Sequence, residues 1–149
     1  MSKYTIAAAA LAAALVVQQQ ALAQSDDDDT PKITRTSKTV PELVLGTKEN
    51  NVSVNRKDFE LVAGQSYRWK ITSSGGFEYR FVTDLFRNVW MNQIVIDDLE
   101  VHMNGAPAWL EFDSAGTISV QFTAVRPGEY TWSVPELADK GLAGKIIIK

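Results

Sequence analysis

Residues 126–149, RPGEYTWSVPELADKGLAGKIIIK, decide the fold. The Pro-Gly pair at 127–128 is a turn signal. Over Tyr130–Val134, apolar residues alternate with polar ones, which indicates a strand buried on one face. The run Ile146–Ile148 has no polar alternation, as expected of an interior strand. The segment therefore predicts a turn, a strand, a loop and a final strand.

This segment resembles the C-terminal half of a cupredoxin, the small blue-copper β-sandwich of plastocyanin and azurin. In that family a Pro-Gly-x-Tyr turn leads to a strand that ends in Cys, and His, Gly-Met and Gly-x-Ile/Val follow at set spacings. The frame is present here at Pro127, Gly128, Tyr130, Gly141, Gly144 and Ile146. The resemblance covers about residues 43–149 and implies an all-β, cupredoxin-like Greek-key antiparallel β-sandwich with at most one short helix.

The copper-ligand positions that the resemblance implies carry no ligands. The Cys, His and Met positions fall on Val134, Leu137 and Leu142, and the first His position falls on Phe77 or its neighbour Glu78. A blue-copper centre needs two imidazoles and a thiolate. The chain has one histidine and no cysteine, so its composition excludes such a centre. The resemblance therefore predicts the fold, and only weakly the family's electron transfer.

The rest of the chain also has the pattern of a β-sandwich, with short strands, frequent turn signals and no long amphipathic helix. Residues 67–72 alternate clearly, and residues 83–88 have the pattern of one helical turn. Leu99–Met103 is expected to pair with Trp109–Phe112 across the strong turn signal Asn104-Gly105.

The N-terminus is expected to direct export. Residues 1–23 combine a basic Lys3, an Ala/Leu/Val-rich core and an Ala-Leu-Ala cleavage site that ends at Ala23, the pattern of a signal peptide. An uncleaved membrane anchor is the alternative, but the apolar run is shorter than the roughly 20 residues that span a bilayer. We therefore expect a periplasmic or secreted protein that is not attached to a membrane after cleavage.

Residues 24–40 are expected to form an acidic, polar, disordered leader before a domain of residues 41–149. The Asp26–Asp29 run in this leader is either a loose tail for a cation or a partner, or a solvated terminus. The second interpretation is favoured, because four adjacent carboxylates do not define a coordination geometry. The chain has a net charge of −3, and this acidic balance argues against a nucleic-acid partner.

Catalytic motifs are scarce. A nucleophile needs a base beside it, and the single imidazole, His102, has no serine-containing motif nearby. No glycine-rich phosphate loop is present either. The chain is therefore expected not to be an enzyme, and a cofactor-free enzyme remains a minor alternative.

Three residues suggest a non-classical copper site: His102, Met103 and Met91. Imidazole and thioether groups suit copper. Neighbouring residues on a strand point to opposite faces, however, which favours a solvent-facing His102 and a core Met103. Trp90 lies outside the alternation of the other aromatic residues and is a candidate for surface contact.

The sequence favours an exported cupredoxin-like binding or accessory module with no cofactor and an unknown periplasmic protein partner. In cupredoxins the loop before the last strand presents an apolar face to partners, so the resemblance makes Leu137 and Leu142 candidate partner contacts. The alternative is a periplasmic protein that binds a copper ion through His102, Met103 and Met91.

A first prediction concerns the spectrum of the purified protein with added Cu(II). With Val134 at the thiolate position, thiolate-to-copper charge transfer is impossible, so the intense blue absorption of a type 1 centre should be absent. Absorption spectroscopy checks this, and an intense blue species from the pure wild-type chain would contradict it.

Overall fold

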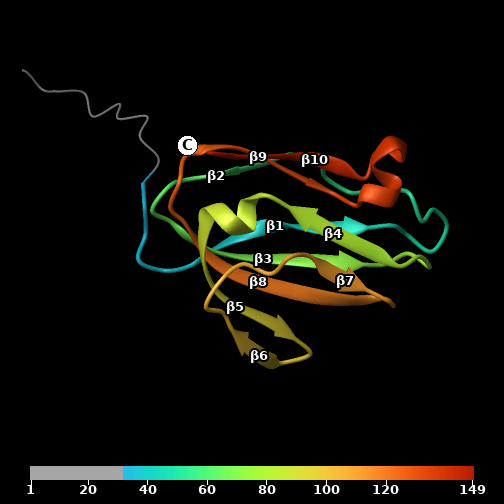
Figure 1. The fold of residues 1–149 in the computed structure, drawn as a ribbon, viewed down its shortest axis with the longest axis horizontal. Helices are drawn as coiled ribbons and strands as arrows, with labels where there is room; N and C mark the ends of the chain where they lie inside the picture. Colours follow the sequence, from blue (N-terminus) through green and yellow to red (C-terminus); the bar gives the residue numbers. More distant parts are fainter. Residues whose placement is uncertain (1–31) are drawn as a thin grey trace, which may run out of the picture. The chain divides into compact units, whose positions relative to one another are not determined.

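The computed structural model describes residues 32–149 (Figure 1). The predicted signal peptide, the Asp26–Asp29 run and residues 24–31 of the expected leader lie outside the described residues. Nothing in the described helices has the length and apolar character needed to cross a membrane.

The described residues form two five-stranded sheets, which confirms the expected β-sandwich. Sheet A has the order β1-β3-β8-β5-β6, and sheet B has the order β2-β10-β9-β4-β7. The elements are β1 (Lys38–Leu45), β2 (Phe59–Leu61), β3 (Ser66–Ser73), β4 (Tyr79–Thr83), η1 (Leu85–Asn88), β5 (Val89–Ile96), β6 (Leu99–His102), β7 (Leu110–Phe112), β8 (Gly116–Ala124), β9 (Gly128–Ser133), η2 (Pro135–Lys140) and β10 (Ala143–Ile148).

Both sheets are mixed, although an antiparallel sandwich was expected. Strand β1 pairs with β3 in parallel, and β2 pairs with β10 in parallel. Parallel neighbours need a crossover and cannot be joined by a tight hairpin. The crossover from β1 to β3 passes through β2 in the other sheet, and β2 is connected to β10 through all the elements between them.

The structure has two short 3-10 helices in its described residues, where at most one short helix was expected. The additional one, η2, lies in the loop before the last strand. Its first residue is Pro135, whose fixed φ suits the first helical position. It ends at Gly141, which has a φ of 99°, a left-handed value that glycine adopts without strain.

The first strand begins at Lys38, so residues 38–40 belong to the domain and not to the leader. Val40 is buried in the core and pairs with Trp69 on β3. The boundary predicted from sequence lies at Pro41, because residues 24–40 have a polar composition. The structure accommodates Pro41 on an edge strand, where the register with β3 shifts between Val40 and Leu43.

The predicted pairing of Leu99–Met103 with Trp109–Phe112 is wrong. Strand β6 pairs with β5, whereas β7 pairs with β4 in the other sheet. Asp97 and Asp98 join β5 to β6 with φ values of 48° and 63°. Left-handed values at both central residues are typical of the two-residue hairpin turn, which matches the twist of the strands it joins. The longer connection after β6 instead leads to sheet B.

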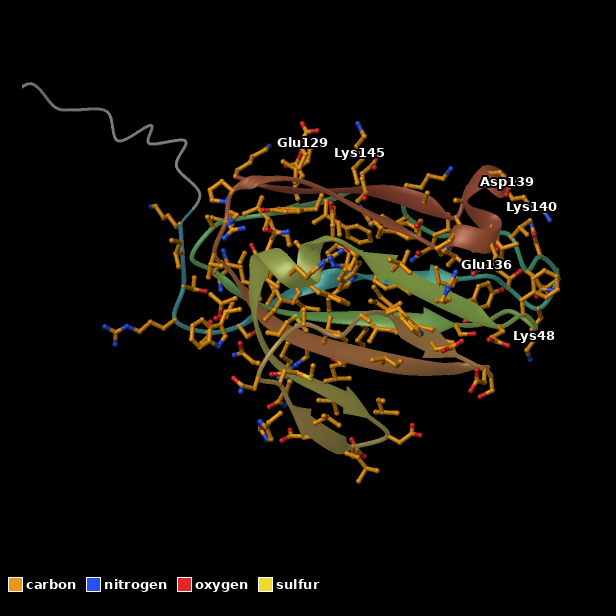
Figure 2. All side chains as sticks on the ribbon, viewed as in Figure 1. Lys48, Glu129, Glu136, Asp139, Lys140 and Lys145 are labelled. Atoms are coloured by element: carbon orange, nitrogen blue, oxygen red, sulfur yellow. The ribbon has the colours of Figure 1, made fainter. Side chains whose placement is uncertain are left out.

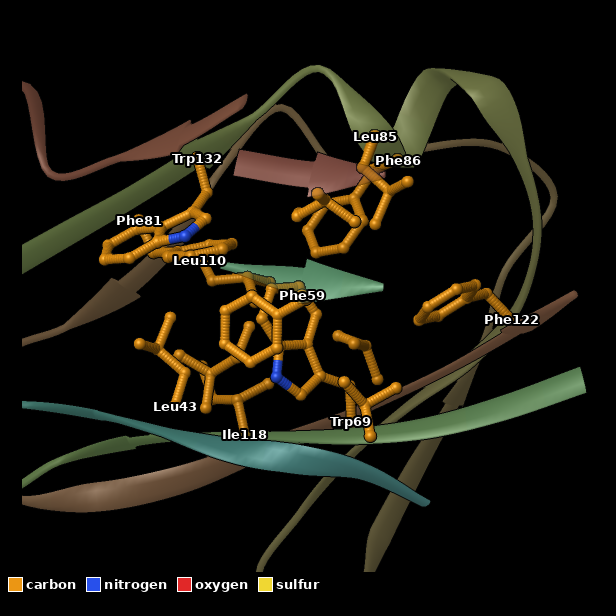
Figure 3. Packing of buried hydrophobic residues seen from close by; sticks show 14 of the residues in the cluster. Leu43, Phe59, Trp69, Phe81, Leu85, Phe86, Leu110, Ile118, Phe122 and Trp132 are labelled. Carbon is orange, nitrogen blue, oxygen red and sulfur yellow. The ribbon is translucent and has the colours of Figure 1, made fainter. Parts of the chain in front are cut away.

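Aromatic rings join the two sheets in the core (Figure 3). Trp69 of sheet A makes edge contacts with two rings of sheet B, at centroid distances of 4.9 Å to Phe59 and 5.7 Å to Phe81. Phe81 in turn stacks on Trp132 at 5.9 Å. Edge-to-face and offset contacts of this kind stabilise beyond the area that they bury.

A second prediction concerns Gly144 in β10. The Lys57 carbonyl passes directly over Gly144 and accepts a hydrogen bond from the Trp132 indole at 2.7 Å. A Cβ at position 144 would overlap both groups. Gly144→Ala should therefore lower the free energy of unfolding by about 1–3 kcal/mol, as measured by urea denaturation.

The matched control is Gly116→Ala in β8, where an added Cβ meets nothing within 4 Å. Equal stability losses in the two variants would contradict the steric explanation.

Candidate functional site

Three of the four positions that carry copper ligands in cupredoxins form ordinary core here. Val134, Leu137 and Leu142 are 1%, 8% and 0% exposed. Their backbones are linked, because the Val134 N–H donates to the Leu142 carbonyl at 2.9 Å and the Leu142 N–H donates to the Leu137 carbonyl at 3.2 Å. The loop is thus held by backbone hydrogen bonds and by apolar burial.

Leu137 and Leu142 are buried and therefore do not form the exposed apolar face that their role as candidate partner contacts requires, whereas the expected burial of Val134 is confirmed. The 3-10 helix η2 explains the difference, because it turns Leu137 towards the core and its polar residues outwards. Figure 2 labels three of these polar residues, Glu136, Asp139 and Lys140. Glu136 also forms an ion pair with Arg80 of β4, which fastens the helix to sheet B.

Phe77, at the first His position, lies on the surface just before β4. The core at this end is filled instead by Tyr79, whose hydroxyl donates to the Asn51 carbonyl at 2.8 Å. None of the four family positions therefore presents a metal-ligating atom.

Three carboxylates gather on the outer side of sheet B. Oxygen atoms of Glu78, Glu111 and Asp113 lie within 4.8 Å of one another, and all three residues are exposed. Hydrogen bonding to Glu111, followed by the charge of Asp113, raises the pKa of Glu78 above its usual value. The Trp109 indole, which donates to Glu111 at 3.0 Å, and then Glu78 lower the pKa of Glu111.

A separate pocket brings together three of the candidates from the sequence: Trp90, Met91 and Met103. It lies between η1, the start of β5 and the loop after β6, and has a volume of about 400 Å³. Trp90 is 71% exposed, whereas Met91 is buried and Met103 is half-buried. The residues that line the pocket are Phe86, Arg87, Val89, Trp90, Met91, Met103, Asn104, Gly105 and Ala106.

His102 is not part of this pocket. It lies opposite Gln93 in the β5–β6 pair, and its Nε2 is 3.5 Å from the Glu100 carboxylate. Its neighbour Met103 faces the opposite way, as the alternation of a strand requires. The structure therefore assembles Met91 and Met103 but leaves His102 apart from them.

The sequence interpretation missed an apolar strip on the β5–β6 hairpin. Ile96, Leu99 and Val101 are 42%, 72% and 54% exposed. The Asp97-Asp98 turn was the available signal for the hairpin, because pairing across it places Leu99 and Val101 beside β5. The strip became visible only when the strand order was known.

Solved structures with a similar fold are copper proteins. A multicopper oxidase from Campylobacter jejuni matches with a TM-score of 0.55 and 11% identity, over 80% of this chain and 31% of that chain. A copper-containing nitrite reductase from Thermus scotoductus SA-01 matches with a TM-score of 0.53 and 12% identity, over 76% of this chain and 30% of that chain. An auracyanin from the photosynthetic bacterium Roseiflexus castenholzii matches with a TM-score of 0.50 and 15% identity, over 76% of this chain and 98% of that chain.

No protein-family model matches the chain, and no curated protein matches it by sequence. The chain spans about a third of the length of the oxidase and the reductase. At these identities the likeness shows the fold alone, and that fold is the cupredoxin fold expected from residues 126–149.

A third prediction tests the core character of the former ligand loop. Leu142→Ala should lower the free energy of unfolding by about 2–5 kcal/mol, because it leaves a cavity among packed side chains. Phe77→Ala, at the exposed family position, should change it by about 0.5 kcal/mol or less. Chemical denaturation measures both values, and a neutral Leu142→Ala would contradict the assignment.

A fourth prediction concerns Glu78. Because its pKa is raised in the folded state, its charged form is unfavourable there, and stability falls as the pH rises through this pKa. Glu78→Gln should therefore raise the melting temperature at neutral pH, and the gain should vanish in acid, where wild-type Glu78 is itself protonated.

Glu129→Gln on β9 is the control, since its side chain lies outside the carboxylate cluster. A gain for Glu78→Gln that persists unchanged at low pH would contradict the electrostatic explanation.

Proposed function

We propose that this chain is an exported, non-catalytic binding module that recognises a protein partner through the pocket beside Trp90. The observation that carries the proposal is the large exposed indole of Trp90 at a pocket also lined by Met91 and Met103. Tryptophan is enriched among the residues that dominate binding energy at interfaces. An exposed indole beside an apolar pocket is therefore a strong candidate for the side chain that binds a partner.

The chemistry of the pocket indicates the kind of group that it takes. Its volume of about 400 Å³ lies in the range of sites that hold a small ligand or a few side chains. Methionine is flexible and polarisable, so Met91 and Met103 can adapt to an apolar group of irregular shape. Arg87 also lines the pocket, and a guanidinium pairs well with a carboxylate. A peptide with an apolar side chain beside an acidic group would satisfy both features.

The position of the pocket supports a role distinct from electron transfer. Phe77 and the loop at Val134–Leu142 mark the metal end of the cupredoxin fold, and here the loop is closed by the buried side chains of Val134, Leu137 and Leu142. The pocket lies near η1, which follows β4, whereas Phe77 precedes β4. Binding would therefore use the opposite end of this strand.

Export and the absence of catalysis are supported by the sequence. Residues 1–23 have the pattern of a signal peptide, and the only imidazole, His102, has no hydrogen bond to a hydroxyl group within residues 32–149.

To test this proposal, peptides that bind the full-length protein are selected from a random displayed library. The selected peptides should bind the wild type, and Trp90→Ala should weaken this binding at least tenfold, which corresponds to about 1.4 kcal/mol. Trp109→Ala is the matched control, because it removes another exposed indole outside the pocket. Equal binding to wild type and Trp90→Ala would overturn the proposal.

A second candidate function is binding of Cu(I) by the same pocket. Thioethers suit Cu(I), and Met91 and Met103 both line the cavity. A competition titration with a Cu(I) chelator should then show weaker binding for Met103→Leu and unchanged binding for His102→Ala. Loss of binding only in His102→Ala would instead place the copper on the outer face of sheet A.

A further inference from the structure

We propose that two copies of this chain form a two-fold dimer through antiparallel pairing of their β6 strands. Strand β6 is the last strand of sheet A, with β5 on one side and an open edge on the other. This inference does not depend on the proposed partner pocket. It rests on the apolar face, the open backbone groups and the charges of β6.

The exposed apolar strip continues the core face of sheet A. In the β5–β6 register Ile96 lies opposite Leu99, and Ile94 lies opposite Val101. Residues directly opposite each other share a face of the sheet, and Ile94 is buried in the core. Leu99 and Val101 therefore belong to the inner face, beyond the cover of sheet B. Figure 1 shows the β5–β6 hairpin lying away from β9 and β10.

Strand β6, with four residues, is a more open sheet edge than the other three. Strand β1 contains Pro41 and a register shift, and β2 and β7 have three residues each. Proline, bulges, lysine and short length are the usual defences of an edge strand against pairing with another chain. Strand β6 contains neither proline nor lysine and presents its apolar face to solvent.

The backbone N–H and C=O groups of β6 that point away from β5 belong to Glu100 and His102. The Met103 N–H donates to the Asn92 carbonyl at 2.9 Å, so the backbone of residue 103 faces the β5 side. Hydrogen-bonded and non-hydrogen-bonded positions alternate along an antiparallel strand. The backbone groups of Val101 thus also face β5, and those of Glu100 and His102 point to the open edge.

Charge selects one register for the pairing of two copies. Among the symmetric antiparallel registers that keep the apolar faces together, the two with the greatest overlap of β6 are centred on Glu100 and on Val101. The first places Glu100 directly opposite Glu100 of the partner subunit, and like charges directly opposite are destabilising. The second places Glu100 opposite His102 of the partner subunit, so an imidazole meets a carboxylate on each side of the axis.

The register centred on Val101 also lets the free backbone groups form hydrogen bonds and brings the apolar side chains of the two copies into contact. The backbone groups of Glu100 and His102 face away from β5. In this register Glu100 forms a hydrogen-bonded pair with His102 of the partner subunit, on each side of the axis. Val101 meets Val101 of the partner subunit at the axis, and Leu99 meets Met103 of the partner subunit. The occupant that fits this edge is therefore a second copy of the chain.

Sedimentation equilibrium on the full chain, over a wide range of concentrations, tests the proposal. The wild type should show a reversible monomer–dimer equilibrium. Val101→Lys, which would bring two ammonium groups together at the axis, should weaken dimerisation at least tenfold. Val125→Lys is the matched control, because Val125 is equally exposed but lies outside β6. A monomer at every concentration, or a dimer that Val101→Lys leaves intact, would overturn the proposal.

A charge reversal tests the register. His102→Glu should weaken the dimer, because carboxylates then face each other, and the double variant Glu100→Lys/His102→Glu should restore it. Failure of the double variant to recover would overturn the Val101-centred register. Thermal unfolding of each variant verifies that it is folded. All variants share the N-terminal segment, so association through that segment would not be lost in His102→Glu and restored in the double variant.

Discussion

The contact between Trp69 and Phe81 joins the two sheets, and the rest of the domain is arranged around it. Trp69 lies on a central strand of sheet A, and Phe81 brings sheet B against it. Trp132 extends the contact to β9, and its indole anchors the Lys57 carbonyl. The Lys145 N–H donates to the same carbonyl at 3.2 Å, which fixes β10 beside it. One aromatic cluster thus orients most strands of sheet B.

The loop before β10 shows how this fold is maintained with aliphatic residues at the ligand positions. Burying a side chain such as Val134 or Leu142 stabilises the fold by about 1.5–3 kcal/mol each and requires no buried charge. The backbone hydrogen bonds among Val134, Leu137 and Leu142 supply the geometry of the loop. Aliphatic packing and a ligated metal are therefore alternative ways to close the same end of the sandwich.

Much of the fold could be predicted from sequence, because alternation along a single strand is a local property. The strands around Trp69 and Trp132 and the turn at Asp97-Asp98 follow from patterns within a few residues. The pairing partners do not, because they depend on contacts between distant segments. The prediction from sequence therefore paired Leu99–Met103 with the wrong strand and did not include the apolar strip on the hairpin.

The candidate site was predicted only in parts, for a related reason. Trp90 stood out because it breaks the alternation of its neighbours, and Met91 and Met103 stood out by their chemistry. Their convergence depends on the loop after β6, whose path no local pattern indicates. The burial of Leu137 was missed because a short 3-10 helix after Pro135 changes the periodicity that a strand or an open loop would have.

Strand β10 connects segments that lie far apart in the chain. It pairs with β2 near residue 60, and the backbone of Lys149 exchanges hydrogen bonds with Leu61 and Ala63 at 3.0 and 2.7 Å. Because β10 lies between β2 and β9 in sheet B, we expect these two strands to keep unpaired edges until β10 is in place. Domains dominated by such distant pairings fold in milliseconds to seconds, more slowly than helical bundles. We therefore expect the folding time of this domain to depend on a search between residues almost ninety positions apart, roughly the separation of Lys149 and Glu60.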